Sequence, residues 1–284
     1  MSPDPTSAEI TSKAKSNLAF ALRCVPAQRR AHLVSFYAYC RVIDDLADDL
    51  HLPLEQKKKG LAGWKNIFTT SQPDPSLGLP NLQREILAVR DLYSIPSQYF
   101  INVIEGCEMD LAPQRFQTWE DLQRYCYRVA SSVGLVCLPL FGADIERSRD
   151  YAITLGYALQ LTNILRDIEE DLQNGNRIYL PLTELAEFGI TEADLAAKRH
   201  NDRFQKFMTF QANRALSLYQ KASDLLPPED FKPLLAPRVM HRIYQTLLIQ
   251  MQADHYQVFT QRYRLTKAQK ITLLLKERFA KHRH

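Results

Sequence analysis

Two stretches of the chain place aspartates four residues apart within what reads as an amphipathic helix. In "FYAYCRVIDDLADDL", which starts at Phe36, the residues Tyr37, Arg41, Asp44 and Asp48 are separated by steps of four, three and four. Because a helix has 3.6 residues per turn, these four side chains share one face. The opposite face is apolar and consists of Phe36, Cys40, Ile43, Ala47 and Leu50.

The same spacing occurs in "YAITLGYALQLTNILRDIEEDL", which covers residues 151–172. Read as one continuous helix, this stretch has a polar face formed by Gly156, Gln160, Asn163, Asp167 and Asp171. The opposite face is apolar and is formed by Leu161, Leu165, Ile168 and Leu172. Gly156 has no Cβ, so a neighbouring helix or a ligand can approach the polar face closely.

Aspartates one helical turn apart repel each other, so both pairs are expected to bind something that neutralises them. Magnesium prefers oxygen ligands and is usually held by one or two carboxylates together with substrate phosphates. We therefore expect the two pairs to face each other across a diphosphate and to hold Mg²⁺, which stabilises the charge of a leaving diphosphate. Arg41 and Arg166 can add charge-assisted hydrogen bonds to the diphosphate oxygens.

Three further interpretations of the acidic pairs are weaker. A single D-x-x-x-D on a helix is usually a solvated acidic face, but two of them beside arginine on amphipathic helices favour a functional site. No D-x-D-x-D-G loop is present, which argues against an EF-hand calcium site. None of the seven histidines follows a glutamate by three residues, which argues against a di-iron bundle.

The elements that carry these pairs are predicted to be helices throughout. Apolar residues recur at intervals of three and four, and no long run alternates with a period of two, so the fold class is all-α. Prolines divide the chain into segments of helical length. No repeat or shift in composition marks an internal boundary, so we expect a flexible N-terminal segment over residues 1–15 and one helical domain over residues 16–284.

Composition argues against several classes of protein. The chain has only nine glycines and neither a dinucleotide-binding nor a P-loop glycine pattern. Its five cysteines include no C-x-x-C pair and no secretory signal precedes them, which favours a reducing cytoplasm. The longest nearly apolar stretch, residues 133–143, is much shorter than the roughly 20 residues that span a bilayer. We therefore expect a cytoplasmic protein without a transmembrane helix.

The end of the chain is strongly basic. Residues 261–284 contain eight Lys or Arg and one Glu, whereas the rest of the chain contains 28 Lys or Arg and 31 Asp or Glu. Apolar side chains recur there at helical spacing, at Ile271, Leu274, Leu275 and Phe279. Such a segment either lies on an anionic membrane surface, which would make the protein peripheral on the inner face, or packs on the core with a solvated basic face. Nucleic acid binding is disfavoured, because no aromatic–basic motif accompanies the charge.

Three stretches of the chain resemble one known family. "DDLAD", "YCYRVASSVG" and "QLTNILRDIEEDLQNGNRIYLP" are similar to sequences of the squalene and phytoene synthase family, the head-to-head isoprenoid condensing enzymes. The resemblance extends from Ser16 to about Lys270, and the chain looks most like the bacterial presqualene diphosphate and squalene synthases. It implies an isoprenoid synthase fold with a central cavity, Mg²⁺, and two prenyl diphosphates as substrates.

The resemblance also implies roles for individual residues. The metal-binding positions that it indicates are Asp44, Asp48, Asn163, Asp167 and Asp171. The positions that match diphosphate contacts are Arg41, Arg166 and Arg177. Further positions that match the family's active site are Tyr125, Gln160 and Tyr244. Near the start, "KSNLAFALRCVP" departs from the Ser-x-Phe type pattern of many members, and Ser16 and Asn17 are the residues that could replace it.

An allylic carbocation needs a dry cavity and aromatic faces to stabilise it. Tyr37, Phe20 and Tyr125 could supply such faces, and the alternative is that they are ordinary core residues. The small residues of "VASSVG" either let a prenyl chain lie between helices or allow close helix packing. The sequence is compatible with both interpretations.

The predicted reaction is the Mg²⁺-dependent head-to-head condensation of two farnesyl diphosphates to presqualene diphosphate. The reaction either stops there or continues to squalene with NADPH, or to dehydrosqualene without it. One alternative is a phytoene synthase that uses two geranylgeranyl diphosphates, and another is a catalytically silent prenyl-binding partner subunit. A terpene cyclase and a head-to-tail elongating enzyme are disfavoured, because their characteristic second motif and arginine pair are missing.

Overall fold

The computed structural model describes residues 6–12, 25–49 and 51–281. Within these ranges the chain forms helices joined by turns and loops, with one isolated β-bridge between Arg115 and Ile178 and no strand. The predicted all-α fold class is therefore confirmed. Ser16, Asn17 and Phe20 lie outside the described residues.

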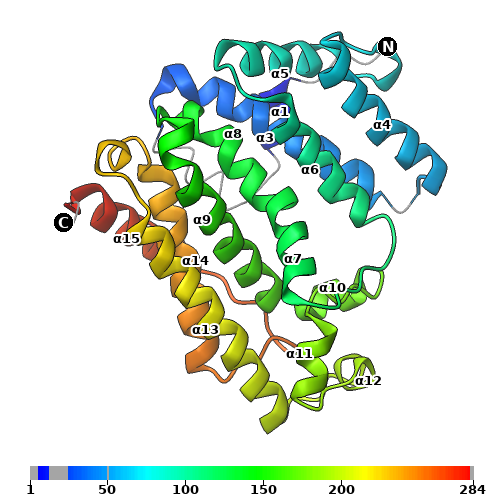
Figure 1. The fold of residues 1–284 in the computed structure, drawn as a ribbon, viewed down its shortest axis with the longest axis vertical. Helices are drawn as coiled ribbons and strands as arrows, with labels where there is room; N and C mark the ends of the chain where they lie inside the picture. The colour runs from blue at the N-terminus through cyan, green and yellow to red at the C-terminus, as the bar shows by residue number, and fades with distance from the viewer. Residues whose placement is uncertain (1–5, 13–24, 50, 282–284) are drawn as a thin grey trace.

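The helices belong to two groups that meet in the middle of the molecule (Figure 1). The first group packs around one hydrophobic core and comprises α1 (Ser7–Ser12), α3 (Ala27–Asp48), α4 (Leu54–Thr70), α5 (Pro80–Leu92) and α6 (Ser97–Met109). The second packs around another core and comprises α7 (Trp119–Cys126), α9 (Ile145–Arg166), α10 (Ile168–Gln173), α11 (Leu182–Glu187), α12 (Glu192–Ala196), α13 (Asp202–Asp224), α14 (Leu235–Ala253) and α15 (Lys267–Phe279). Helix α8 (Ser132–Phe141) contributes side chains to both cores.

Local sequence explains where many of the helices begin. Prolines precede or open α3, α4, α5 and α6, where the missing N–H of proline leaves no helical hydrogen bond unmade. Helices α7, α12 and α15 begin with capping boxes, in which a threonine and the residue three positions later bond each other's backbone N–H. These signals are local, so the sequence alone places these starts well.

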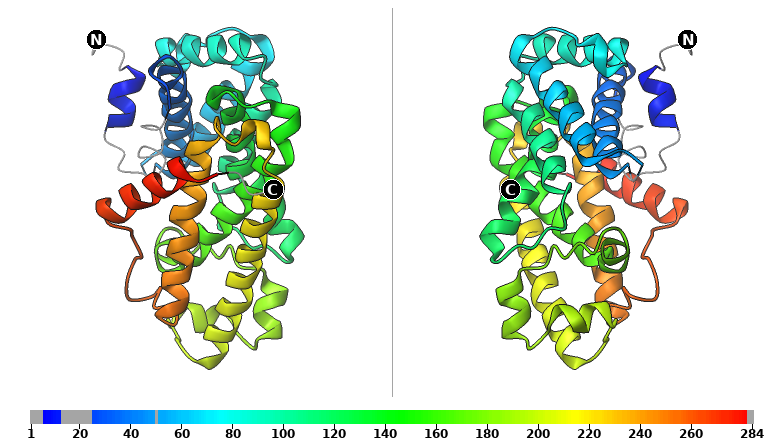
Figure 2. Two further views of the ribbon diagram at one scale, coloured as in Figure 1. Left: turned by 90° about the vertical axis from the view of Figure 1, so that its left-hand side faces the viewer. Right: turned by 90° about the vertical axis from the view of Figure 1, so that its right-hand side faces the viewer.

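Helix α9 runs through the centre of the second group and contacts α7, α8, α13 and α14 (Figures 1 and 2). At Gly156 the backbone of the neighbouring π-helical turn η3 (Tyr127–Ser131) comes so close that a Cβ would lie 2.6 Å from Ser131 Cα. The glycine therefore serves close contact with a neighbouring segment. The hydroxyl of Ser131 donates to the Ile153 carbonyl at 2.9 Å, so the small residues of "VASSVG" act here in close helix packing.

The second acidic stretch is not one continuous helix. Helix α9 ends at Arg166, Asp167 takes a non-helical conformation with φ −105° and ψ 16°, and α10 begins at Ile168. The prediction of an unbroken helix over this stretch was wrong. Hydrogen bonds of helical spacing nevertheless continue across the break, from Asp167 N to Asn163 O at 2.9 Å and from Asp171 N to Asp167 O at 2.8 Å.

The N-terminal segment contains one described helix. Ser7–Ser12 form α1, which contacts α3, and Ser7 is buried and bonds the Glu85 carboxylate of α5. These six residues are thus helical where the sequence analysis expects a flexible segment. The domain start at residue 16 lies outside the described residues and stays a prediction.

Within the described ranges, no helix has both the length and the apolar character needed to cross a membrane.

Candidate active site

A polar cavity of about 440 Å³ lies where the two groups of helices meet. Side chains from α3, α7, α9, α10 and α14 line it, together with residues that follow α6 and α10. The lining residues are Arg41, Asp44, Asp48, Asp110, Tyr125, Gln160, Asn163, Ile164, Arg166, Asp167, Asp171, Arg177, Tyr179 and Tyr244. Every described residue predicted to bind metal or substrate or to act in catalysis is among them except Tyr37, which is buried on α3 outside this lining.

Helix α3 presents its acidic residues together with an arginine. Arg41 Nη1 donates to Asp44 Oδ2 at 2.9 Å, and the same guanidinium pairs with Asp45. Burial, and to a smaller extent the neighbouring carboxylate of Asp48, raises the pKa of Asp44 to about 6. This carboxylate is therefore held in surroundings that favour a nearby cation.

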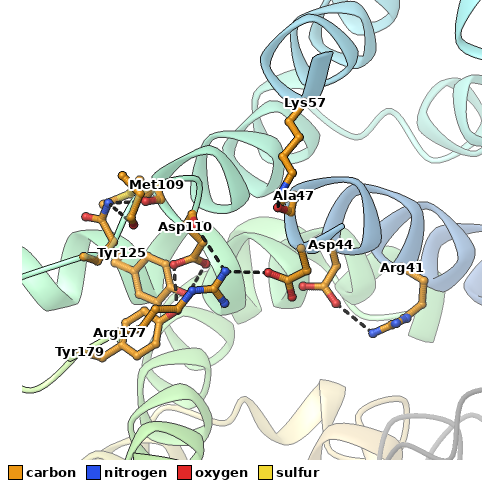
Figure 3. A network of polar contacts seen from close by, with 12 residues as sticks. Arg41, Asp44, Ala47, Lys57, Met109, Asp110, Tyr125, Arg177 and Tyr179 are labelled. Carbon is orange, nitrogen blue, oxygen red and sulfur yellow. Dashed lines mark hydrogen bonds and ion pairs between the residues drawn. The ribbon is translucent and has the colours of Figure 1, made fainter. Parts of the chain in front are cut away.

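A single arginine connects the two halves of the cavity (Figure 3). Arg177, which follows α10, donates from Nη2 to Asp48 Oδ1 at 2.8 Å and to the Asp110 carbonyl at 3.3 Å. The residues Arg177 and Asp48 are 129 positions apart in the chain. The ion pair thus joins the first acidic helix to the segment beyond the second.

Asp110, directly after α6, organises two tyrosines (Figure 3). Its carboxylate accepts hydrogen bonds from the Tyr125 and Tyr179 hydroxyls, each at 2.8 Å. The two rings stack with their centroids 5.1 Å apart. Burial raises the pKa of Asp110, and the two hydroxyl donors oppose that rise. Both tyrosines are therefore held in fixed orientations at the cavity wall.

Sequence reasoning missed Asp110 and Tyr179. Tyr179 belongs to the stretch "NGNRIYLP" and follows Arg177 by two residues. Its place beside a predicted site residue could have indicated that it lines the cavity. Asp110 follows α6, which carries Glu105 and Glu108, and neither glutamate lines the cavity. The local sequence therefore does not distinguish Asp110 from its acidic neighbours.

The α9 side of the cavity carries a buried amide. Asn163 Oδ1 is shielded from solvent and has no hydrogen-bond partner among the described residues. One turn later, Arg166 Nε donates to Asp167 Oδ1 at 2.8 Å, and the Arg166 guanidinium lies 5.9 Å from the centre of the Tyr244 ring. A buried acceptor without a donor is costly, so a cation or a water belongs beside Asn163.

The loop after α14 brings a further arginine to the same carboxylates. Arg262 lies 3.2 Å from Asp167 and 2.7 Å from Glu170. A second hollow, of about 600 Å³, adjoins the cavity between this loop and the α9–α10 junction. Arg262 is not among the site residues predicted from the sequence, since in the sequence it is one of several basic residues at the end of the chain.

Comparison with known proteins identifies the family. The model of the squalene/phytoene synthase family matches residues 11–269. The chain belongs to the squalene/phytoene synthase family. This confirms the resemblance seen in the sequence.

Several members of the squalene/phytoene synthase family are about one-third identical to this chain. The chloroplast phytoene synthase of an Oncidium hybrid cultivar is 33% identical, over 88% of this chain and 61% of its own length. The presqualene diphosphate synthase of Zymomonas mobilis is 34% identical, over 87% of this chain and 84% of its own length. The 15-cis-phytoene synthase of Synechococcus elongatus is 32% identical, over 89% and 85%. The chain thus spans about three-fifths of the length of the Oncidium relative.

Two solved structures have the same fold as this chain. A dehydrosqualene synthase in complex with a ligand superposes with a TM-score of 0.80 and 28% identity, over 95% of this chain and 93% of its own. The squalene synthase HpnC of Alicyclobacillus acidocaldarius gives a TM-score of 0.75 and 27% identity, over 88% and 93%. The isoprenoid synthase fold expected from the sequence is therefore confirmed.

The carboxylate and amide side chains that line the cavity fit Mg²⁺ that is shared with a diphosphate. Burial and the neighbouring Asp167 raise the pKa of Asp171 to about 8, so both acidic pairs contain a carboxylate that lacks a sufficient counter-charge. Within the described residues, no three His, Cys, Asp or Glu side chains converge to hold a metal by themselves. Such a site suits an ion that takes one or two carboxylates and completes its shell with water and phosphate oxygens.

Proposed function

We propose that this protein is a prenyltransferase that joins two prenyl diphosphates head to head with Mg²⁺. The observation that carries the proposal is that two aspartate pairs, from α3 and from the α9–α10 junction, line one cavity with three arginines. Carboxylates that bind cations and guanidinium groups that bind phosphate oxygens are the two donor types that a metal–diphosphate complex requires. Family membership supports the same reaction class.

The residues that would hold Mg²⁺ are Asp44, Asp48, Asn163, Asp167 and Asp171. When bound, Mg²⁺ supplies positive charge that stabilises a diphosphate as it leaves. The side chains of Arg41, Arg166 and Arg177 would exchange part of their pairing with aspartates for hydrogen bonds to the diphosphate oxygens. Gln160 and Tyr244 line the cavity beside them and would complete the polar wall.

Two tyrosines at the cavity wall can stabilise the carbocation that forms when diphosphate leaves. Tyr125 and Tyr179 are oriented by Asp110, and the π-electrons of their rings can stabilise positive charge on the prenyl chain. Head-to-head coupling ends in the loss of a proton as the cyclopropane closes. The released diphosphate would accept that proton, or a tyrosine hydroxyl would accept it while passing its own proton to the Asp110 carboxylate. Tyr37 stays a predicted substrate contact from α3.

For the substrate we propose two farnesyl diphosphates, giving presqualene diphosphate. The relative from Zymomonas mobilis is named for that product, and the two structural neighbours are named as dehydrosqualene and squalene synthases. The alternative is condensation of two geranylgeranyl diphosphates to phytoene, which the phytoene synthases among the relatives favour. The continuation from presqualene diphosphate is either NADPH-dependent reduction to squalene or proton loss to dehydrosqualene.

The test is to incubate purified protein with Mg²⁺ and either farnesyl or geranylgeranyl diphosphate, with and without NADPH. The organic extract is then analysed by mass spectrometry before and after phosphatase treatment. Presqualene alcohol after phosphatase treatment would support the proposal. Squalene that forms only with NADPH, or dehydrosqualene that forms without it, would extend the proposal to a second step. A C40 product from geranylgeranyl diphosphate would replace the proposal with phytoene synthesis. No coupled product from either substrate would count against the condensation reaction and favour the alternative of a silent prenyl-binding subunit.

A further inference from the structure

The outer face of α15 carries an apolar stripe, which consists of Ile271, Leu275 and Phe279. Ile271 and Leu275 are each 49% exposed, and Phe279 is 78% exposed. The three residues follow one another at intervals of four, so they lie in one row along the helix. Single exposed hydrophobic residues are common on protein surfaces, whereas three in a row on one helix mark an interaction surface.

The opposite face of α15 holds the helix against the protein. Glu277 is buried and accepts hydrogen bonds from Arg238 Nη2 at 2.6 Å and from Arg242 Nε at 2.7 Å, both on α14. Leu273 and Leu274 pack against the second core. These contacts fix the rotation of α15, so the apolar stripe points away from the body. Figure 2 shows α15 at the edge of the molecule, on the same side as α1.

Basic residues border the stripe on both sides. At 100° per residue, Lys267 and Arg278 lie along one side of the stripe and Lys276 along the other. All three are exposed, and Lys281, just beyond the helix, is exposed as well. The only acidic residue of α15 is Glu277, which is directed inward. The outward face is therefore an apolar row between positive charges.

We propose that this face of α15 docks on an anionic lipid surface. A helix that lies in a membrane interface buries one apolar row among the acyl chains and places Lys and Arg at the level of the headgroups. Both requirements are met on the same face, and each basic residue near an anionic surface strengthens binding by about 1 kcal/mol, or roughly 5-fold. A second copy of this chain is a poor occupant, because a two-fold contact would bring the same basic residues against each other.

Docking at this point would hold the cavity close to the membrane. Arg262, which contacts Asp167, precedes the start of α15 at Lys267 by five residues. Five residues span at most about 18 Å even when fully extended. If the proposed function holds, the product, which carries long apolar chains, is thus released beside the bilayer that takes it up. The docking itself rests on exposure and charge and does not depend on that reaction.

The experiment is co-sedimentation of the full chain with phosphatidylcholine vesicles, with or without phosphatidylglycerol, in the absence of prenyl diphosphates. The unmodified protein should bind only the anionic vesicles, and added salt should weaken that binding. Leu275→Ser/Phe279→Ser should weaken binding by more than about 10-fold, because apolar burial is lost. Lys267→Glu/Lys276→Glu should weaken it by at least about 25-fold, because two basic residues are removed.

Matched variants elsewhere control for general changes in hydrophobicity and charge. Leu54→Ser/Leu92→Ser removes two exposed apolar side chains from the first group of helices, and Lys206→Glu/Lys221→Glu reverses two exposed charges on α13. Both controls should bind the vesicles like the unmodified protein. Thermal unfolding checks that every variant is folded.

Three outcomes would overturn the docking proposal. In the first, the unmodified protein stays in the supernatant with anionic vesicles, and in the second, the α15 variants bind as tightly as their controls. In the third, sedimentation velocity shows a dimer that Leu275→Ser/Phe279→Ser dissociates, and the stripe then joins two copies of the chain. Because no substrate is present, failure of docking is distinguishable from failure of the condensation reaction.

Discussion

Substitution of Asp110 tests how much turnover depends on the orientation of the two tyrosines at the cavity. Its carboxylate holds two tyrosine hydroxyls, and its carbonyl holds Arg177. Asp110→Asn keeps the size of the side chain but leaves one acceptor oxygen for two donors. We expect turnover to fall by about 100-fold, because misplacing groups by about 1 Å has effects of that size.

The same variant should melt within a few degrees of the unmodified protein, since the backbone contact to Arg177 is kept. Tyr179→Phe added to Asp110→Asn should cost little more, because the two residues act through one hydrogen bond. Steady-state kinetics of the single and double variants measure both effects. Fully additive losses in the double variant would show that Asp110 acts in some other way.

His241 on α14 should make stability sensitive to acid. Burial is the main cause that lowers its pKa to about 4, and the neighbouring Arg242 adds to it. Between about pH 6.5 and pH 4 the unfolded chain therefore binds a proton at this histidine that the folded chain does not, and the contribution of His241 to stability falls as the pH drops. Asp44 and Asp171, whose pKa values are raised, act in the opposite direction, so the effect of His241 is measured as a difference between two variants. The loss approaches about 1.4 kcal/mol per pH unit within this window.

Replacing His241 with Phe should remove this contribution, so the variant should lose less stability, or gain more, than the unmodified protein as the pH drops. The ring of His241 stacks on Tyr219 with 4.8 Å between centroids, and a phenyl ring can keep that contact. Denaturant unfolding of both proteins at about pH 7, 5.5 and 4.5 measures the difference across the window. An equally steep loss of stability in His241→Phe would assign the acid sensitivity to other groups.

At the scale of elements, the contact between α9 and η3 depends on Gly156. Alanine there would place its Cβ 2.6 Å from Ser131 Cα and 2.7 Å from Ser131 N, and backbone atoms cannot move aside cheaply. Gly156→Ala should therefore destabilise the protein by about 1–3 kcal/mol. This loss exceeds the gain of up to about 1 kcal/mol that alanine brings to a helix.

Gly60 on α4 offers the matched control. An added Cβ would meet only the end of the Leu46 side chain, at 2.9 Å, and that side chain can rotate away. Gly60→Ala should therefore be neutral or slightly stabilising. Thermal and denaturant unfolding compare the two variants. A Gly156→Ala protein as stable as Gly60→Ala would mean that η3 shifts freely against α9.

The sequence predicts α3 and its acidic face well, because an amphipathic period is a local property. The break at Asp167 is not predictable in this way, but the prediction of the site does not depend on it. Hydrogen bonds of helical spacing continue through the break, so Asn163, Asp167 and Asp171 still line one cavity. The spacing of the side chains is kept although the helix is interrupted.

Residues brought in by the tertiary fold are a different case. Asp110 bonds Tyr179 across 69 positions, and Arg262 reaches Asp167 from the loop after α14. Neither position has a periodic neighbourhood that links it to the acidic helices. Such partners are defined by where loops meet, and that depends on the packing of the whole molecule.

At the scale of the whole molecule, the two groups of helices turn negative charge toward each other across the cavity. The raised pKa values of Asp44 and Asp171 show that these carboxylates are held at a cost when no cation neutralises them. Asp44→Asn and Asp171→Asn should therefore melt no lower than the unmodified protein, while turnover falls by at least about 100-fold. Stability and activity are expected to change in opposite directions, as they do where a site holds unfavourable charge.

Addition of a metal–diphosphate ligand should make the unmodified protein more stable than the two asparagine variants. Mg²⁺ with pyrophosphate is expected to bind the folded protein and not the unfolded chain, so at about 100 times its dissociation constant it should stabilise the unmodified protein by about 2.7 kcal/mol. The two asparagine variants lack a carboxylate for the metal and should gain much less, and pyrophosphate with EDTA should stabilise none of the three. Differential scanning calorimetry with each addition measures these shifts. An equal gain in the variants would place the metal–diphosphate complex somewhere other than between the two acidic pairs.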